Sequence, residues 1–314
     1  MKKRVFFVLL CILAVCMSGC GNDSIRFGAS GEGGVYGKIA VSLADSVHND
    51  ASDMNFDVQY TAGSAANVRL LSQNNLDVAI AQADIIDNAY YGTGTFKKSY
   101  RGYLAVAGLY TEACQIVVSA DSGIKTIEDL EGKRVSVGES ESGTEQNAYQ
   151  ILETCGLNKS FVNEVNLDYS AACEKLKSGE IDAFFCTLAP GSAVIKDLSE
   201  EYDIRLIELS DATIQRLVEA YGFYMPYTLE KGTYKNQNED INTIGVTAVL
   251  LANEKMDNKQ VKTIINALFR DREKINASLS ANIKLDPETA VNGVSIPFHE
   301  GALEYYRELG IDIP

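Results

Sequence analysis

The sequence has little positive charge and few histidines, and both shortages restrict its function. It contains 28 Lys and Arg residues against 43 Asp and Glu residues, so its formal net charge is −15 at pH 7. Phosphate binding needs clustered positive charge, which argues against nucleic acid as a partner. The two histidines, His48 and His299, are too few for a histidine-rich metal site, and we expect neither a metal nor a cofactor.

The cysteines of the chain form no redox or zinc motif. Of seven, Cys11, Cys16 and Cys20 lie close to the N-terminus. The spacings of the other four match neither a CxxC pair nor a zinc ligand set. They fit four buried thiols or, in an exported chain, one disulfide such as Cys173–Cys186. The four are Cys114, Cys155, Cys173 and Cys186.

Long apolar runs are also scarce, and the only prominent one is at the N-terminus. Residues 1–4 are Met-Lys-Lys-Arg, residues 5–17 are apolar, and residues 18–20 are Ser-Gly-Cys. This order is typical of a secretory signal, and the run is shorter than the ~20 apolar residues of a membrane-spanning helix. The ending Met-Ser-Gly-Cys resembles the lipobox of bacterial lipoproteins. We therefore expect residues 1–19 to be a signal peptide and Cys20 to be lipidated.

Export and lipidation predict a protein outside the cytoplasm, anchored to the cell membrane. No ATP or NAD is supplied there, so capture, sensing and hydrolysis are the remaining classes of function. Removal of Lys2, Lys3 and Arg4 leaves 25 basic and 43 acidic residues, a net charge of −18. This charge keeps the body of the chain away from anionic lipid headgroups, so only the lipid would hold it at the membrane.

The rest of the chain alternates short apolar segments with amphipathic ones, which predicts an α/β fold with a parallel sheet. We expect two lobes, formed by residues 20–116 and 117–246, with residues 247–314 returning to the first lobe. Strands are expected at 25–28, 56–60, 76–82, 104–109, 115–119, 134–138, 163–167, 181–186, 204–209 and 243–252. Helices are expected at 35–47, 65–73, 83–91, 142–155, 170–177, 193–202, 258–271 and 301–309.

Three loops end a strand and open a helix, namely residues 30–36, 63–67 and 142–144. The first N–H groups of a helix have no partners within it, and the helix dipole favours negative charge there. Glycines in these loops let the backbone approach a ligand closely. Because ligands of open α/β sheets bind beyond the carboxyl ends of the strands, the three helix starts predict a cleft for a small carboxylate.

The candidate ligand contacts come from these loops and from neighbouring strand ends. Some have a second interpretation: Ser64 fits a helix cap, and Ser142 with Glu145 fits a capping box. Tyr36 and Tyr110 are as typical of a core as of a site. The candidates are Ser30, Gly33, Tyr36, Ser64, Asn67, Gln82, Asp84, Tyr110, Ser142, Gly143, Thr144, Thr187 and Pro190.

The motifs, taken in order, resemble those of one family. The runs 27–36 (FGASGEGGVY), 61–71 (TAGSAANVRLL) and 79–84 (AIAQAD) are similar to the opening motifs of TAXI solute receptors of TRAP transporters. Further similar motifs lie at 121–126, 132–138, 142–144, 179–185, 232–234 and 296–302. The loop 139–141 (ESE) is more acidic than the family pattern. The resemblance implies a two-lobed type II periplasmic-binding-protein fold that closes on a ligand and delivers it to a TRAP permease.

We therefore expect a monomeric, lipid-anchored solute-binding protein for a small organic acid or amino acid, with glutamate, glutamine and dicarboxylates as examples. No arginine lies in the cleft loops, which favours a zwitterion over a dianion. A sensor or antigen with the same pocket but no transport role is the alternative. A hydrolase using Ser64 or Ser142 is disfavoured because neither lies in a GxSxG elbow, so we expect no enzyme.

Overall fold

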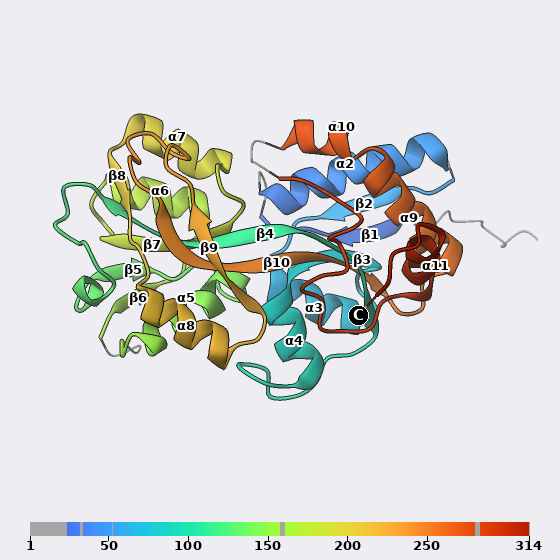
Figure 1. The fold of residues 1–314 in the computed structure, drawn as a ribbon, viewed down its shortest axis with the longest axis horizontal. Helices are drawn as coiled ribbons and strands as arrows, with labels where there is room; N and C mark the ends of the chain where they lie inside the picture. The colour runs from blue at the N-terminus through green and yellow to red at the C-terminus, as the bar shows by residue number, and fades with distance from the viewer. Residues whose placement is uncertain (1–23, 32–33, 52, 158–160, 280–282, 314) are drawn as a thin grey trace, which may run out of the picture.

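One mixed β-sheet of ten strands runs through the described part of the chain. The computed structural model describes residues 24–31, 34–51, 53–157, 161–279 and 283–313 (Figure 1). The predicted signal peptide and Cys20 lie outside these residues, as does Gly33. The strand order is β2-β1-β3-β10-β4-β7-β5-β6, with β8 paired to β4 and β9 paired to β10.

The strands and helices follow the expected alternation for most of the chain. The strands are β1 (Ile25–Gly28), β2 (Phe56–Gln59), β3 (Val78–Gln82), β4 (Tyr103–Ser119), β5 (Arg134–Ser136), β6 (Asn163–Val165), β7 (Ala183–Leu188), β8 (Ile204–Leu206), β9 (Tyr224–Leu229) and β10 (Ile241–Asn253). The helices are α2 (Val35–Asp50), α3 (Ser64–Ser72), α4 (Ala83–Tyr91), α5 (Gly143–Thr154), α6 (Tyr169–Lys177), α7 (Ala193–Glu201), α8 (Asp211–Ala220), α9 (Asn258–Arg270), α10 (Arg272–Ser278) and α11 (Glu300–Glu308), with a short 3-10 turn, η1 (Glu128–Leu130).

The sheet has a parallel group at each end and an antiparallel centre. Strands β2, β1 and β3 are parallel, and so are β7, β5 and β6. Between them, β10 is antiparallel to β3 and β4, and β4 is antiparallel to β7. The prediction of a parallel sheet is thus correct for the two ends and wrong for the centre, because β4 and β10 cross the molecule in opposite directions.

Figure 1 shows the elements in two groups, joined by the long strands β4 and β10. We call β1–β3 with α2–α4 and α9–α11 the first half, and β5–β9 with α5–α8 the second half. Strand β4 pairs with β10 from Tyr103 to Ala113 and with β7 from Ala113 to Val118. Strand β10 pairs with β9 in its early part and with β3 in its later part. The chain therefore crosses between the halves along these two strands.

Two separate strands were expected at 104–109 and 115–119, but the structure has one continuous strand, β4, over both segments. Thr111 and Glu112, which look like a break in the apolar pattern, pair with Thr247 and Val246 of β10. The ladder absorbs two irregularities of register along this strand, so pairing continues through the polar residues. Helices α8 and α10 and strand β9 are elements that the sequence pattern did not predict.

The core follows from coverage of both sheet faces by helices. All five residues of β3 are buried, which is typical of a parallel strand covered on both sides. The four cysteines of the described residues are free thiols, and Cys155 alone among them is not fully buried. The alternative Cys173–Cys186 disulfide is therefore not formed. Within the described ranges, no helix has both the length and the apolar character needed to cross a bilayer.

Candidate ligand-binding cavity

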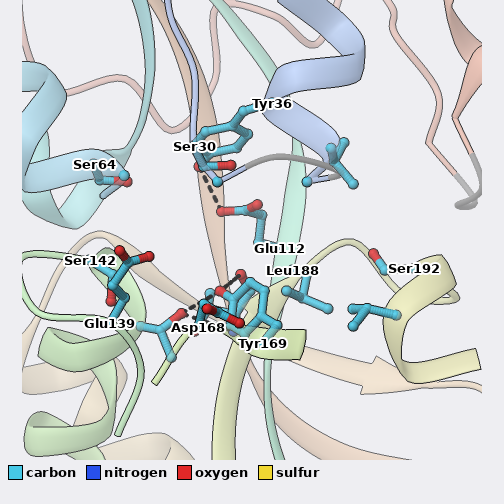
Figure 2. Close-up of a pocket in the computed structure, with 18 of the residues that line it drawn as sticks. Ser30, Tyr36, Ser64, Glu112, Glu139, Ser142, Asp168, Tyr169, Leu188 and Ser192 are labelled. Atoms are coloured by element: carbon cyan, nitrogen blue, oxygen red, sulfur yellow. Dashed lines mark hydrogen bonds between the residues drawn. The ribbon is translucent and has the colours of Figure 1, made fainter. Parts of the chain in front are cut away.

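A cavity of about 440 Å³ lies between the two halves of the molecule. Its wall contains residues of both halves, and Figure 2 shows Glu112 of β4 between them. The first half contributes Ser30, Tyr36, Ser64 and Gln82, and the second half contributes Glu139, Ser142, Gly143, Thr144, Asp168, Tyr169, Thr187 and Ser192. All three loops predicted from the sequence supply residues to this one cavity.

Five helices begin at the cavity wall. Helices α2 and α3 come from the first half, and α5, α6 and α7 come from the second. Each follows a parallel strand, and the carboxyl ends of parallel strands meet at one edge of a sheet. The N-terminal N–H groups of α2, α3 and α7 have no side-chain cap, whereas Ser142 caps α5 and Asp168 caps α6. The wall is therefore rich in backbone donors.

The two halves approach each other closely where Gln82 faces Gly143. A Cβ atom added at Gly143 would lie 1.7 Å from Oε1 of Gln82, so any larger residue here would require the Gln82 side chain to move. Close by, the backbone N–H of Ala65 donates to the carbonyl of Glu141 at 3.2 Å. Arg69 also forms an ion pair with Glu141, and its Nη1 lies 2.7 Å from Oε1 of that carboxylate. These contacts join α3 of the first half to the loop before α5.

Glu112 is the buried acid at the centre of the cavity. Only 4% of the residue is exposed, yet it belongs to the wall. Its Oε2 accepts hydrogen bonds from the Tyr36 hydroxyl at 2.8 Å and from Nε2 of Gln82 at 3.1 Å, and its Oε1 accepts one from the Tyr110 hydroxyl at 3.1 Å. Burial raises the pKa of Glu112 to about 7, although these three donors oppose the shift.

A hydroxyl network lines the second half of the cavity. The backbone N–H of Thr187 donates to Oγ1 of Thr144 at 3.2 Å, and the Tyr169 hydroxyl donates to the Thr187 carbonyl at 3.2 Å. The Thr144 and Tyr169 hydroxyls are 2.6 Å apart. Because the Tyr169 hydroxyl uses its proton for the Thr187 carbonyl, the Thr144 hydroxyl is the donor to Tyr169. The network therefore holds the start of α5 and the start of α6 against β7.

Eight of the sequence-derived candidates belong to the wall. Ser64 is the first residue of α3 rather than its cap, and its Oγ accepts a hydrogen bond from the backbone N–H of Gln82 at 3.1 Å. Ser142 is a cap, since its Oγ accepts from the N–H of Glu145 at 3.1 Å. The eight are Ser30, Tyr36, Ser64, Gln82, Ser142, Gly143, Thr144 and Thr187.

The structure places four further candidates behind the wall. Asn67 is fully buried, and its Nδ2 donates to the carbonyls of Ile80 at 2.8 Å and Ala29 at 3.1 Å, so it fixes the strand ends. The Tyr110 hydroxyl donates a hydrogen bond to Oε1 of Glu112 and does not belong to the wall. Pro190 is buried and does not belong to the wall. The side chains of Asn67 and Tyr110 are thus hydrogen-bonded within the protein.

Asp84 is the fourth of these candidates. It is fully buried at the start of α4, where its Oδ2 accepts a hydrogen bond from Nδ2 of Asn147 at 2.6 Å. Burial raises its pKa to about 7. Since Asn147 belongs to α5, this bond links the two halves, and neither residue belongs to the cavity wall. The remaining candidate, Gly33, lies outside the described residues.

Sequence reasoning missed several residues of the wall. In the sequence, Glu112 is a single acidic residue between apolar segments, and no motif around it indicates a binding residue. Asp168 had a readable signal, because its side chain accepts from the N–H of Ala171 at 2.8 Å in the manner of an N-cap followed by a helix. Glu139, Tyr169 and Ser192 reach the wall through the loops that follow β5, β6 and β7.

The charges of the wall are mostly negative. Glu112, Glu139 and Asp168 belong to it, and among the described residues Lys38 is its basic member. Partial burial raises the pKa of Glu139, and the nearby Asp168 adds to this effect. No arginine belongs to the described part of the wall, and Arg69 of α3 pairs with Glu141.

The site contains no assembled catalytic group among the described residues. The Oγ atoms of Ser64 and Ser142 accept backbone N–H groups, and His299 caps α11, accepting from the N–H of Gly301 at 3.2 Å. His48 lies in the last turn of α2. The described part of the chain also holds no group of three His, Cys, Asp or Glu residues able to bind a metal ion.

Several solved structures have a similar fold, and they include a protein named as a binding protein. A protein of Bordetella bronchiseptica has a TM-score of 0.60 at 14% identity, over 91% of this chain and 98% of that one. A candidate L-cystine ABC transporter of Listeria monocytogenes has a TM-score of 0.54 at 14% identity, over 83% and 98%. The alkanesulfonate-binding protein of Xanthomonas axonopodis, bound to MOPS, has a TM-score of 0.50 at 16% identity, over 81% and 77%.

These similarities define the class of fold: a type II periplasmic-binding-protein fold, as the sequence predicted. The family follows from the sequence itself. The model of the NMT1-like family matches residues 27–310, which is nearly the whole described chain, and the protein belongs to that family.

Proposed function

We propose that this protein is a lipid-anchored, extracytoplasmic solute receptor that captures a small organic acid or amino acid. The observation that carries the proposal is the cavity of about 440 Å³ at which five helices begin. Its volume is in the range of small-molecule sites, and its backbone donors suit a carboxylate. The receptor performs no reaction, because binding alone accounts for the arrangement of its polar groups.

Capture would proceed by closure of two lobes about β4 and β10. The lobes of this proposal are residues 20–116 with 247–314, and residues 117–246. Both crossings between the halves run along these two strands, which makes them the natural hinge. Contacts such as Arg69 with Glu141 would form as the lobes approach. A ligand held by both lobes then stabilises the closed form.

Delivery would go to a membrane permease of the TRAP type. The ordered motifs that resemble TAXI receptors support this class, and acylated Cys20 would hold the receptor beside the permease. Uptake by cells carrying the permease should then depend on an ion gradient and persist when ATP is depleted with the gradient clamped. Loss of uptake on ATP depletion alone would assign the receptor to an ABC transporter instead. A Cys20→Ala variant should lose incorporation of labelled fatty acid.

The binding function is tested by calorimetry on the exported chain, purified in detergent. L-glutamate, L-glutamine, succinate and 2-oxoglutarate are the first probes. A true ligand at about 100 times its Kd should stabilise the fold by ~2.7 kcal/mol. Ser30→Leu, which would fill part of the cavity, should weaken binding, whereas Ser140→Leu, exposed and outside the wall, should not. Equal effects of the two variants would contradict this site.

A further inference from the structure

A second cavity, of about 1130 Å³, lies beside α4, α5 and the segment that joins α8 to β9. No described residue of its wall belongs to the first cavity. Figure 1 shows α4, α5 and α8 in the lower part of the view, whereas α6 and α7, which begin at the first cavity, lie in the upper part. One face of α5 lines the second cavity with Gln146, Tyr149, Gln150 and Glu153.

A chain of hydrogen bonds fixes the orientation of the Gln150 amide. Nδ2 of Asn147 donates to Asp84 and, at 2.8 Å, to the Tyr224 hydroxyl. The Tyr224 hydroxyl therefore uses its own proton for Oε1 of Gln150, which leaves Nε2 as the free end of the amide. Among the described residues, Nε2 of Gln150 has no hydrogen-bond partner, and it is not one of the fully covered unpaired atoms. Because only 8% of Gln150 is exposed and the residue belongs to the wall, Nε2 is a donor open to the cavity.

Aromatic rings and carboxylates lie beside this donor. Tyr221 and Phe223 belong to the wall, are half-buried, and stack with ring centroids 5.7 Å apart. Burial raises the pKa of Tyr221, and the nearby Glu153 carboxylate adds to this effect. Glu153 and Asp87 are the acids of the wall; neither has an ion-pair partner among the described residues, and no Lys or Arg belongs to the described wall. Rings and carboxylates both attract cations, so this wall favours a positive group.

We propose that the second cavity binds an organic ammonium ion that carries a hydroxyl or carbonyl oxygen close to its nitrogen. The charged group lies against Tyr221 and Glu153, and the oxygen accepts a hydrogen bond from Nε2 of Gln150. Gln150 and Glu153 are one turn apart on α5, where neighbouring side chains begin ~5–6 Å from each other, so the charge and the oxygen must be a few bonds apart. Amino alcohols such as choline and ethanolamine have this arrangement. The site is separate from the first cavity and does not depend on the ligand bound there.

The test compares two amino alcohols with analogues of nearly the same size, by calorimetry on the exported chain in detergent. For choline, 3,3-dimethylbutan-1-ol replaces the charged nitrogen by carbon, and ethyltrimethylammonium lacks the oxygen. For ethanolamine, the corresponding analogues are propan-1-ol and ethylamine. We expect choline or ethanolamine to bind at least fivefold more tightly than both of its analogues, because one lacks the charge and the other the hydrogen-bond acceptor. The acidic chain attracts any cation, so equal binding of an amino alcohol and its analogue without oxygen overturns the proposal.

Glu153→Gln supplies the second measurement. Glu153 is exposed, so the variant should fold, and it should lower the affinity for the amino alcohol at least threefold. The matched control is Glu131→Gln, an exposed residue outside both walls, which should leave the affinity unchanged. Ser30→Leu, which fills part of the first cavity, should also leave it unchanged. No binding of either amino alcohol, an unchanged affinity of Glu153→Gln, or a loss of binding in Ser30→Leu overturns this second site, and none of these results bears on capture of an acid or amino acid in the first cavity.

Discussion

At the scale of single residues, the site depends on groups that are costly to bury. Glu112 and Asp84 are both nearly inaccessible, and burial raises the pKa of each to about 7. Their hydrogen-bond donors among the described residues are hydroxyl and amide groups rather than basic side chains. Such acids keep a proton more readily in the folded chain than in the unfolded chain, which links stability to pH.

The first prediction concerns this link. Glu112 has an ordinary pKa of 4.5 and a folded pKa of about 7, so between these values the folded state binds more protons. The free energy of unfolding should therefore fall as pH rises from about 4.5 to about 7, and Glu112→Gln should show a shallower fall. Urea unfolding of both chains across this range, without ligand, checks it. Parallel curves for the two chains would show that Glu112 does not titrate as described; Asp84 contributes with the same sign in both.

The second prediction concerns Gly143. A methyl group there would meet the Gln82 side chain, which would have to move and give up its bond to Glu112. Gly143→Ala should weaken ligand binding at least tenfold and lower the free energy of unfolding by about 1–3 kcal/mol through overpacking. Gly222→Ala is the control, because nothing lies within 4 Å of a Cβ at that position. Calorimetry and urea unfolding distinguish the two, and a binding constant unchanged by Gly143→Ala would contradict the close approach.

At the scale of elements, helix starts contribute to stability and, in the proposed function, to ligand binding. Asp257 caps α9, accepting from the N–H groups of Lys259 at 2.9 Å and Gln260 at 3.3 Å, and Ser142 caps α5 in the same way. The two caps differ in their position relative to the cavity. Ser142 belongs to the cavity wall, whereas α9 packs on α11 and α2 of the first half.

The third prediction separates these roles. Ser142→Ala and Asp257→Ala should each lower the free energy of unfolding by about 1 kcal/mol, because each leaves helix N–H groups without a partner. Only Ser142→Ala should also change ligand affinity. Thermal unfolding and calorimetry of both variants provide the measurement. If Asp257→Ala weakened binding as much as Ser142→Ala, the effect would be one of general stability rather than of position.

At the scale of the whole molecule, polar contacts join the two halves in addition to the pairing of β4 and β10, among them Asp84 with Asn147 and Arg69 with Glu141. The ion pair of Arg69 with Glu141 is the charged contact between them on the α3 side, and both side chains are partly exposed. Ion pairs of this kind contribute about 0.2–1 kcal/mol and weaken with salt. If the halves close on a ligand as proposed, the pair would favour the closed form by no more than this amount.

The fourth prediction follows from that balance. Arg69→Ala should raise the Kd of a confirmed ligand by up to about fivefold at low salt, and the difference from the native chain should shrink at high salt. Arg134→Ala is the matched control, because its bidentate pair with Asp182 lies within the second half. Titrations at two salt concentrations check the effect. A larger loss for Arg134→Ala than for Arg69→Ala would mean that the pair between the halves does not act on closure.

The sequence by itself determined the local parts of this protein. The strand-to-helix loops with their glycines, the Ser142 cap and the buried strand β3 depend on a few adjacent residues, and so their positions were predictable. The ordered motifs also indicated the fold class, through their resemblance to a known receptor family. These features are readable because hydrogen bonds and backbone angles within a turn or a helix start are set by neighbours in the chain.

Only the tertiary structure decided which distant residues meet. Glu112 became the central acid because β4 continues through it, paired to β10, and because Tyr36, Gln82 and Tyr110 converge on it. Asn67 and Asp84, by contrast, turned inward to join strand ends and halves. Burial and hydrogen-bond partners at these positions come from segments far apart in the chain, and no local pattern of residues encodes them.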